Sequence, residues 1–130
     1  IASFEKDGVI LGYNALVDWD RTDREYVSAV IELKVTPSRD CGFDKIASRI
    51  YGYPEIRSLQ LMSSSGYDLM LTIEGRTMKD VAAFVASKLA TIDGVISTAT
   101  HFVLKKYKDK GVVYGEKKKD ERDQMYDGLQ

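Results

Sequence analysis

The residues of this sequence with the clearest chemical potential lie in one short stretch, Ser64-Ser65-Gly66-Tyr67-Asp68. Asp68 begins a predicted strand, where its carboxylate could receive an α-ammonium group through charge-assisted hydrogen bonds. The backbone N–H groups of Ser64, Ser65 and Gly66 could hold an α-carboxylate, because successive amides in a turn form an anion-binding concavity. The alternative is an aspartate that caps its own hairpin. The sequence leaves both interpretations open.

Four other side chains are candidates for ligand binding, metal binding or catalysis. Thr98 and Thr100 share one face of a predicted strand and could offer hydroxyl groups to a ligand at an interface, although we favour plain strand formers. His101 is the only histidine and cannot assemble a metal site alone, and Cys41 has no second cysteine to resolve an oxidised form. No nucleophile with its base, metal-ligand spacing or phosphate loop is visible. We therefore expect no catalytic residue, no metal and no cofactor, and hence not an enzyme.

The length, charge and cysteine count of the chain exclude several classes of protein. A chain of 130 residues suits one domain, and its hydrophobic share of 44% is enough for a packed core. The net charge of −1 leaves no global basic field for nucleic acid. The single cysteine forbids an internal disulfide and suggests a reducing compartment, the cytoplasm. The apolar runs are far shorter than the roughly 18–20 residues of a membrane helix, so we expect no membrane contact.

Hydrophobic periodicity predicts the elements that position these residues. Apolar alternation predicts strands at 26–35, 56–62, 67–74 and 95–106, and helical spacing predicts helices at 43–51 and 77–89. This order is the ferredoxin-like β-α-β-β-α-β arrangement, an α+β fold with an antiparallel sheet and both helices on one face. The other face would expose apolar side chains, including Val30. We therefore predict that a second copy covers it in a two-fold dimer.

The two ends of the chain differ from this middle part. Residues 1–7 look like the end of an amphipathic helix, and the extended segment 9–17 is too apolar for a free linker, so we expect it to pair with another strand, such as its copy in a partner. The alternatives are a hinge from a missing upstream domain, which we favour, and an N-terminal strand that completes the sheet. Trp19 is expected at an inter-subunit or interdomain contact. After 105 the chain is charged and reads as a solvated extension with a weak helix at 117–124.

Residues 4–18, FEKDGVILGYNALVD, resemble the junction between the DNA-binding and sensor domains of the Lrp/AsnC (leucine-responsive and asparagine-type) transcriptional regulators. The matching residues are Phe4-Glu5, Gly8-Val9-Ile10 and Gly12-Tyr13. Residues 27–37, 65–69 and 94–104 are similar to the first strand, the turn and the last strand of the family's sensor domain, also called the RAM domain. The resemblance covers residues 1–108.

The resemblance implies three parts: residues 1–24 with the end of a DNA-binding helix and the hinge strand, an effector-binding and oligomerisation domain at 25–108, and a charged tail at 109–130. In the family, the sensor domain dimerises into an α/β barrel, and dimers often assemble into tetramers or octamers. A small effector, usually an amino acid, binds between dimers. DNA would be contacted only through the missing N-terminal domain.

Two other functions remain open. One is a stand-alone sensor module that partners other regulators. The other is a small dimeric enzyme, since barrels of ferredoxin-like domains also host monooxygenases and isomerases. An enzyme would place His101 with a carboxylate in an enclosed pocket inside the barrel.

Overall fold

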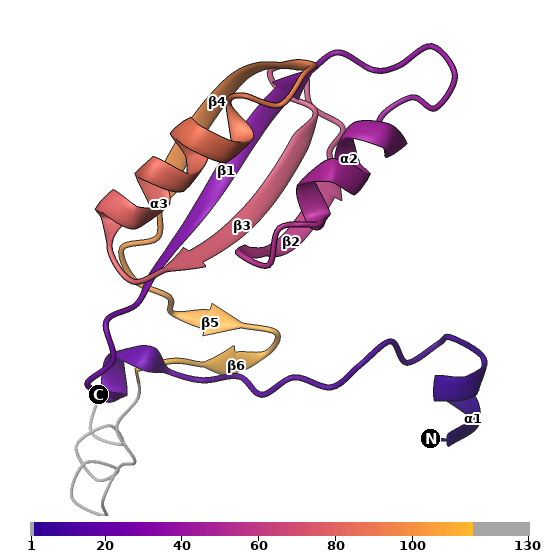
Figure 1. Cartoon of the computed structure of the whole chain (residues 1–130). Coiled ribbons are helices and arrows are strands. Elements are labelled where there is room, and N and C mark those ends of the chain that lie inside the picture. The colour runs from indigo at the N-terminus through magenta and orange to yellow at the C-terminus, as the bar shows by residue number, and fades with distance from the viewer. Residues whose placement is uncertain (1, 116–130) are drawn as a thin grey trace, which may run out of the picture.

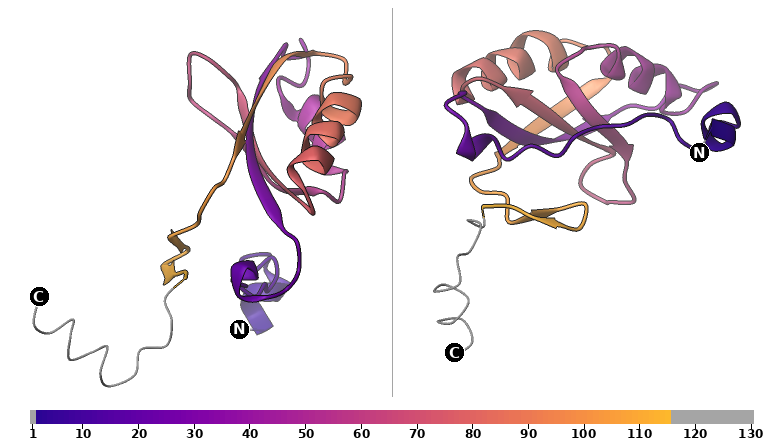
Figure 2. Two further views of the ribbon diagram at one scale, coloured as in Figure 1. Left: turned by 90° about the vertical axis from the view of Figure 1, so that its left-hand side faces the viewer. Right: turned by 90° about the horizontal axis from the view of Figure 1, so that it is seen from below.

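The computed structural model describes residues 2–115, and its centre is one four-stranded antiparallel sheet (Figure 1). The strands lie in the order β2-β3-β1-β4, and their bounds are Val27–Val35 (β1), Ile56–Leu61 (β2), Leu69–Gly75 (β3) and Val95–Phe102 (β4). The helices are α2 (Asp44–Tyr51) and α3 (Met78–Phe84), which continues into the π-helical turn η2 (Val85–Leu89). They cover the same face of the sheet (Figure 2). The predicted ferredoxin-like α+β fold is confirmed.

Strand β1 lies in the middle of the sheet because it pairs on both sides. Leu33 lies opposite Leu69 of β3 on one side and opposite Thr98 of β4 on the other. Ile31 and Leu33 are fully buried under the helices, whereas Glu32 between them is directed to the other face. The alternation of apolar and polar residues along β1 therefore identifies the face of the strand that the helices cover.

The core is a single cluster of aliphatic side chains between this sheet face and the helices. Burying one such side chain completely contributes about 1.5–3 kcal/mol relative to leaving it exposed. The buried members of the cluster are Ala29, Ile31, Leu33, Val35, Ile46, Ile50, Leu69, Leu71, Ile73, Val81, Val85 and Leu89.

The connection from β3 into α3 is tight. The Thr77 hydroxyl caps the helix by accepting a hydrogen bond from the backbone N–H of Asp80 at 3.1 Å, as the sequence predicts. Two residues earlier, a Cβ atom built on Gly75 would lie 2.9 Å from Cγ2 of the buried Val81. A glycine is therefore required where the helix passes over the end of the strand.

The N-terminal segment forms a helix and then an extended arm. Helix α1 (Ala2–Lys6) ends near Gly8, which has a φ of +77°. In the described part of the chain, residues 11–17 make no backbone–backbone hydrogen bond, and Leu11 is 93% exposed. The arm leads into a short 3-10 turn, η1 (Trp19–Arg21). Its pairing with a strand of a partner stays a prediction.

The segment after β4 contains a hairpin that the sequence analysis missed. Strand β4 ends at Phe102 rather than at 106, and a second, two-stranded sheet follows, with β5 (Lys108–Asp109) and β6 (Val112–Val113). The turn residues Lys110 and Gly111 have φ values of +49° and +83°, as a two-residue hairpin turn of type I′ requires. The predicted helix at 117–124 lies outside the described residues. No helix within residues 2–115 has the length and apolar character needed to cross a membrane.

We predict that Gly75→Ala destabilises the domain by about 1–3 kcal/mol, because the added methyl group overpacks against Val81, whose β-branched side chain cannot easily turn away. Denaturant unfolding would measure the change in the free energy of unfolding. Gly66→Ala is the matched control, since a Cβ there meets no atom within 4 Å. Equal stability of the two variants would contradict the close approach.

Candidate functional site

Asp68 lies where the ends of three strands meet. Its side-chain Oδ2 accepts a hydrogen bond from the backbone N–H of Val35 at 2.9 Å. Its own N–H donates to the carbonyl of Leu33, and its carbonyl accepts from the N–H of Met62. The carboxylate thus has a structural role, but not the predicted cap on its own hairpin: the bonded oxygen extends the pairing between β1 and β3 beyond the last regular pair.

The same carboxylate retains capacity for a ligand. Within the described residues, Oδ1 of Asp68 has no hydrogen-bond partner, and the side chain is half-buried. The neighbouring serines of the turn, Ser64 and Ser65, are exposed. The N–H of Gly66 donates to the Ser64 hydroxyl at 3.3 Å, so one of the three proposed turn amides has a partner within the turn. Tyr67, between the turn and the aspartate, is half-buried.

Thr98 and Thr100 are not brought to this turn within one copy of the chain. They pair with Leu33 and Ile31, so they lie on the helix-covered side of β4 and are half-buried there. Strand β1 separates them from β3, which places them about 10 Å from the strand that follows the turn. A single ligand would reach both sets only across a contact between copies.

The other face of the sheet is uncovered in one chain and is less apolar than the sequence analysis expected. The large side chain of Phe102 does not contribute to it, because it packs against the core from the helix side. Strand pairing places both aliphatic and polar side chains on this open face. Those of β1, β3 and β4 are Ser28, Val30, Glu32, Lys34, Met70, Thr72, Glu74, Ser97, Ala99 and His101.

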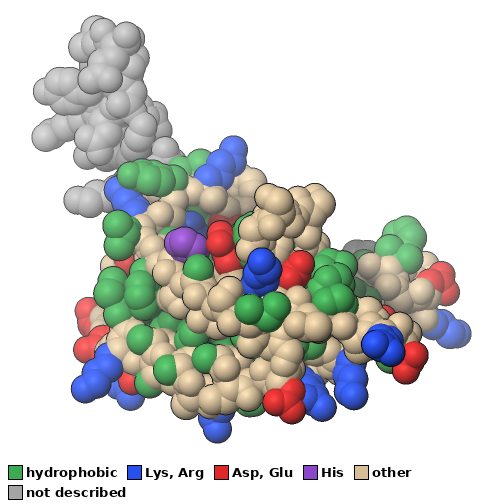
Figure 3. All heavy atoms as spheres, turned by 90° about the horizontal axis from the view of Figure 1, so that it is seen from above, with side chains coloured by type: hydrophobic (Ala, Val, Ile, Leu, Met, Phe, Trp, Pro, Cys, Tyr) green, Lys and Arg blue, Asp and Glu red, His purple; other side chains and the backbone are tan. Residues whose placement is uncertain are grey.

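His101 and Glu32 form an ion pair on this open face if the imidazole is protonated. His101 Nε2 lies 3.5 Å from Glu32 Oε1, and the two side chains are 59% and 31% exposed. The space-filling view shows the histidine beside a carboxylate-bearing side chain, with hydrophobic side chains around them (Figure 3). An exposed pair of this kind contributes little to stability by itself.

A second cluster lies at the opposite end of β1, around Tyr26. The Tyr26 ring stacks on Trp19 with 5.5 Å between ring centroids, and the Arg24 guanidinium lies 4.9 Å from the Trp19 centroid. Burial, helped by the nearby Glu74 carboxylate, raises the pKa of Tyr26 above its usual range. Glu74 also pairs with Arg57 at 3.4 Å. Trp19 therefore packs within its own chain, in addition to any interdomain contact it was predicted to make.

A groove of about 350 Å³ runs between α2 and the edge strand β2. Sequence reasoning missed it, because the groove arises only when α2 leaves the edge of the sheet uncovered. Its apolar lining includes Phe43, Tyr51, Leu59, Leu61 and Leu69.

The side chains of residues 2–115 offer no cluster of metal ligands. Within residues 2–115, no three His, Cys, Asp or Glu side chains come together as a metal site requires. Cys41 is an exposed free thiol in the loop before α2.

The family comparison covers the whole sheet and the hairpin. Residues 28–113 match the family model described as the Lrp/AsnC ligand binding domain. Among curated proteins, an HTH-type transcriptional regulator of Bacillus subtilis, YugG, is 51% identical over 115 residues, which are 88% of this chain and 69% of that protein. The leucine-responsive regulatory protein of Haemophilus influenzae is 25% identical, over 83% of this chain and 64% of its own length.

Solved structures show the same fold. The transcriptional regulator NMB0573 of Neisseria meningitidis, in complex with L-Met, superposes with a TM-score of 0.68 at 22% identity, over 85% of this chain and 71% of that one. AsnC of E. coli superposes with a TM-score of 0.67 at 16% identity, over 85% of this chain and 72% of its own. With the family match, these findings show that the chain belongs to the Lrp/AsnC family of transcriptional regulators, and that residues 28–113 are its ligand-binding domain.

Proposed function

We propose that this chain is the effector-sensing and oligomerisation portion of an Lrp/AsnC-type regulator, and that it binds an amino acid at contacts between subunits. Residues 1–24 would be the end of a DNA-binding-domain helix with the hinge strand, residues 25–108 the effector-binding and oligomerisation domain, and 109–130 a charged tail. Effector binding would then modulate DNA binding by the parent protein, which acts in the cytoplasm. Since the relatives are named as transcriptional regulators, we propose no enzymatic activity.

The observation that carries the ligand proposal is the divided role of Asp68. Its Oδ2 is fixed by the backbone of Val35, which orients the carboxylate without consuming Oδ1. A preoriented carboxylate can receive an α-ammonium group with little loss of side-chain entropy. The exposed amides of Ser64 and Ser65 supply the complementary donors for an α-carboxylate. The name of the Neisseria structure, a complex with L-Met, supports this ligand class.

Contacts between copies would complete the site. The open face, with Val30, Met70 and Ala99, is the surface we propose for a two-fold dimer, sheet face against sheet face. Further assembly to a tetramer or octamer would bring Thr98 and Thr100 of one copy toward the turn of another. In the sheet-to-sheet dimer, the His101–Glu32 pair would be buried in the interface. The free energy cost of removing both charges from water would then have to be offset by their attraction and by further hydrogen bonds.

The ligand proposal predicts that Asp68→Asn separates folding from binding. The asparagine can still accept the Val35 N–H, so thermal unfolding without ligand should change little. The lost charge should remove the thermal shift produced by a stabilising amino acid at millimolar concentration, a shift that corresponds to about 2.7 kcal/mol when the ligand is at 100 times its Kd. Differential scanning fluorimetry over the amino acids would measure both effects.

Asp93→Asn is the control for this experiment, because it makes the same change in a loop outside the proposed site. A wild-type shift that survives in Asp68→Asn would exclude Asp68 as the ammonium acceptor. No shift with any amino acid would leave the chain with an assembly role alone.

The assembly proposal predicts that Ala99→Asp weakens the dimer at least about tenfold, because a carboxylate placed beside Glu32 would be buried in the interface at a cost of more than 1.4 kcal/mol. Ala83→Asp puts the same side chain on the exposed side of α3 and should leave the dimer unchanged. Sedimentation velocity over a concentration series would measure the dissociation constants. A wild-type chain that is monomeric at micromolar concentration would contradict the dimer.

A further inference from the structure

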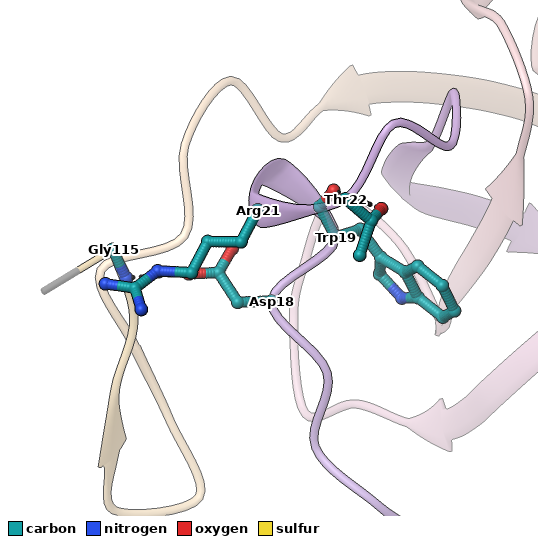
Figure 4. Close-up of polar contacts among 5 residues, drawn as sticks. All are labelled: Asp18, Trp19, Arg21, Thr22 and Gly115. Atoms are coloured by element: carbon teal, nitrogen blue, oxygen red, sulfur yellow. Dashed lines mark hydrogen bonds and ion pairs between the residues drawn. The ribbon is translucent and has the colours of Figure 1, made fainter. Parts of the chain in front are cut away.

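The root of the N-terminal arm is bonded to the residue that follows the C-terminal hairpin. The Asp18 carboxylate accepts a hydrogen bond from the backbone N–H of Gly115, with 2.9 Å between N and Oδ2 (Figure 4). The two residues are 97 positions apart, so this contact closes a loop that contains the entire sensor sheet. Arg21 pairs with the same carboxylate at 3.7 Å from within η1, and the Asp18 side chain is only 21% exposed.

Hydrogen bonds and a stack of aromatic rings connect the residues after Asp18 to the start of β1. The Thr22 hydroxyl donates to the Trp19 carbonyl at 2.7 Å and accepts from the backbone N–H of Arg24 at 3.3 Å. Trp19 itself stacks on Tyr26, one residue before β1 begins. These short-range contacts make 18–26 a compact turn that moves with β1.

The residues that precede Gly115 are fastened to β4. The Lys106 ammonium lies 5.3 Å from the Tyr114 ring centroid and 3.4 Å from the Asp109 carboxylate, so it bridges both limbs of the hairpin. The Tyr114 N–H closes the hairpin by donating to the Tyr107 carbonyl at 2.8 Å. The chain enters this hairpin directly from β4 through residues 103–106. A two-stranded hairpin with such short strands is marginal alone, so it needs attachments of this kind.

From this arrangement we propose that the C-terminal hairpin is a clasp on the hinge, and that Asp18 is the positioning residue that fixes the direction in which the arm leaves the sensor. Residues 11–17 make no backbone–backbone hydrogen bond within the described part of the chain, and the Tyr13 hydroxyl donates to Glu5 of α1 rather than to the sheet. The direction is therefore set at its root, where Asp18 joins the arm to a hairpin carried by another strand.

The clasp assigns a role to the hairpin that starts the charged C-terminal region. Its relevance to regulation rests on the proposed function, since the arm must lead to a DNA-binding domain for its direction to matter. In that case a displacement of β4, which carries Thr98 and Thr100, would reach the arm through the hairpin and Asp18. The clasp itself is independent of any ligand.

Trp19 is the only tryptophan of the chain, and it lines a hollow together with Asp18, Tyr114 and Gly115, so its exposure reports on the clasp. Removing the acceptor in Asp18→Ala should raise the ratio of open to closed clasp about tenfold, as expected for losing a hydrogen bond to a charged group. The open form should expose Trp19, so the acrylamide quenching constant should rise and the emission should shift to longer wavelength. Asp18→Asn retains an acceptor for the Gly115 N–H and should restore most of the protection.

Two controls separate the clasp from other effects. Asp23→Ala removes a neighbouring exposed carboxylate that takes no part in the contacts described above, and it should leave quenching unchanged. Arg21→Ala removes the ion pair but keeps the bond to Gly115, so its effect should be small. Far-ultraviolet circular dichroism of each variant would verify that the sheet is intact.

A chain that ends at Lys106 provides the decisive comparison. Without the hairpin, Trp19 should be at least as accessible as in Asp18→Ala, and adding Asp18→Ala should change nothing further. Equal protection of Trp19 in the wild type and the truncated chain would overturn the proposal, as would an effect of Asp18→Ala that persists in full after truncation. Because no ligand enters these measurements, the clasp and the amino-acid site succeed or fail separately.

Discussion

The structure depends on the burial and double pairing of β1. This strand fills the centre of the sheet, its inward side chains Ile31 and Leu33 are fully buried, and both of its edges are hydrogen-bonded. Its two ends are also fixed, at Val35 by the Asp68 carboxylate and just before Val27 by the stack of Tyr26 on Trp19. Both candidate functional regions are therefore built on the two ends of one strand.

The central fold was predictable because its signals are local and periodic. A nine-residue alternation defines β1, and the Thr77 cap with its downstream apolar stripe defines α3. The C-terminal hairpin carried a weaker signal, since its strands have two residues each and one of them is Lys108–Asp109. The turn residue Gly111 between Tyr107 and Val112 was the available clue. The residue that follows the hairpin, Gly115, is bonded to Asp18, far away in sequence, and no local pattern shows such a contact.

The sequence predicts which residues belong to the candidate site, but not how these residues are arranged in space. From the sequence, Asp68 could either cap its hairpin or bind a ligand. The geometry gives it a structural bond to Val35 through Oδ2 and leaves Oδ1 without a partner among the described residues, so a structural role does not exclude ligand binding. The sequence also places Thr98 and Thr100 on a common face. Which face that is depends on the register with β1, and register is a property of two strands rather than one. The contact between His101 and Glu32 could not be predicted from the sequence either, because it also depends on the register between two strands.

A signal between the two ends of β1 would have to travel about 30 Å, the length of nine extended residues. Strand β1 does not bend easily, because it is hydrogen-bonded on both edges and lies against a close-packed core. The segments that can move are therefore those attached to its ends. Coupling free energies between sites are typically 1–3 kcal/mol. One or two hydrogen bonds made in only one state supply that amount. A bond such as that between Asp18 and Gly115 is of this size, and it joins the arm to the hairpin that follows β4, the strand of Thr98 and Thr100. In the proposed clasp, breaking this bond would change the direction of the arm without repacking the core.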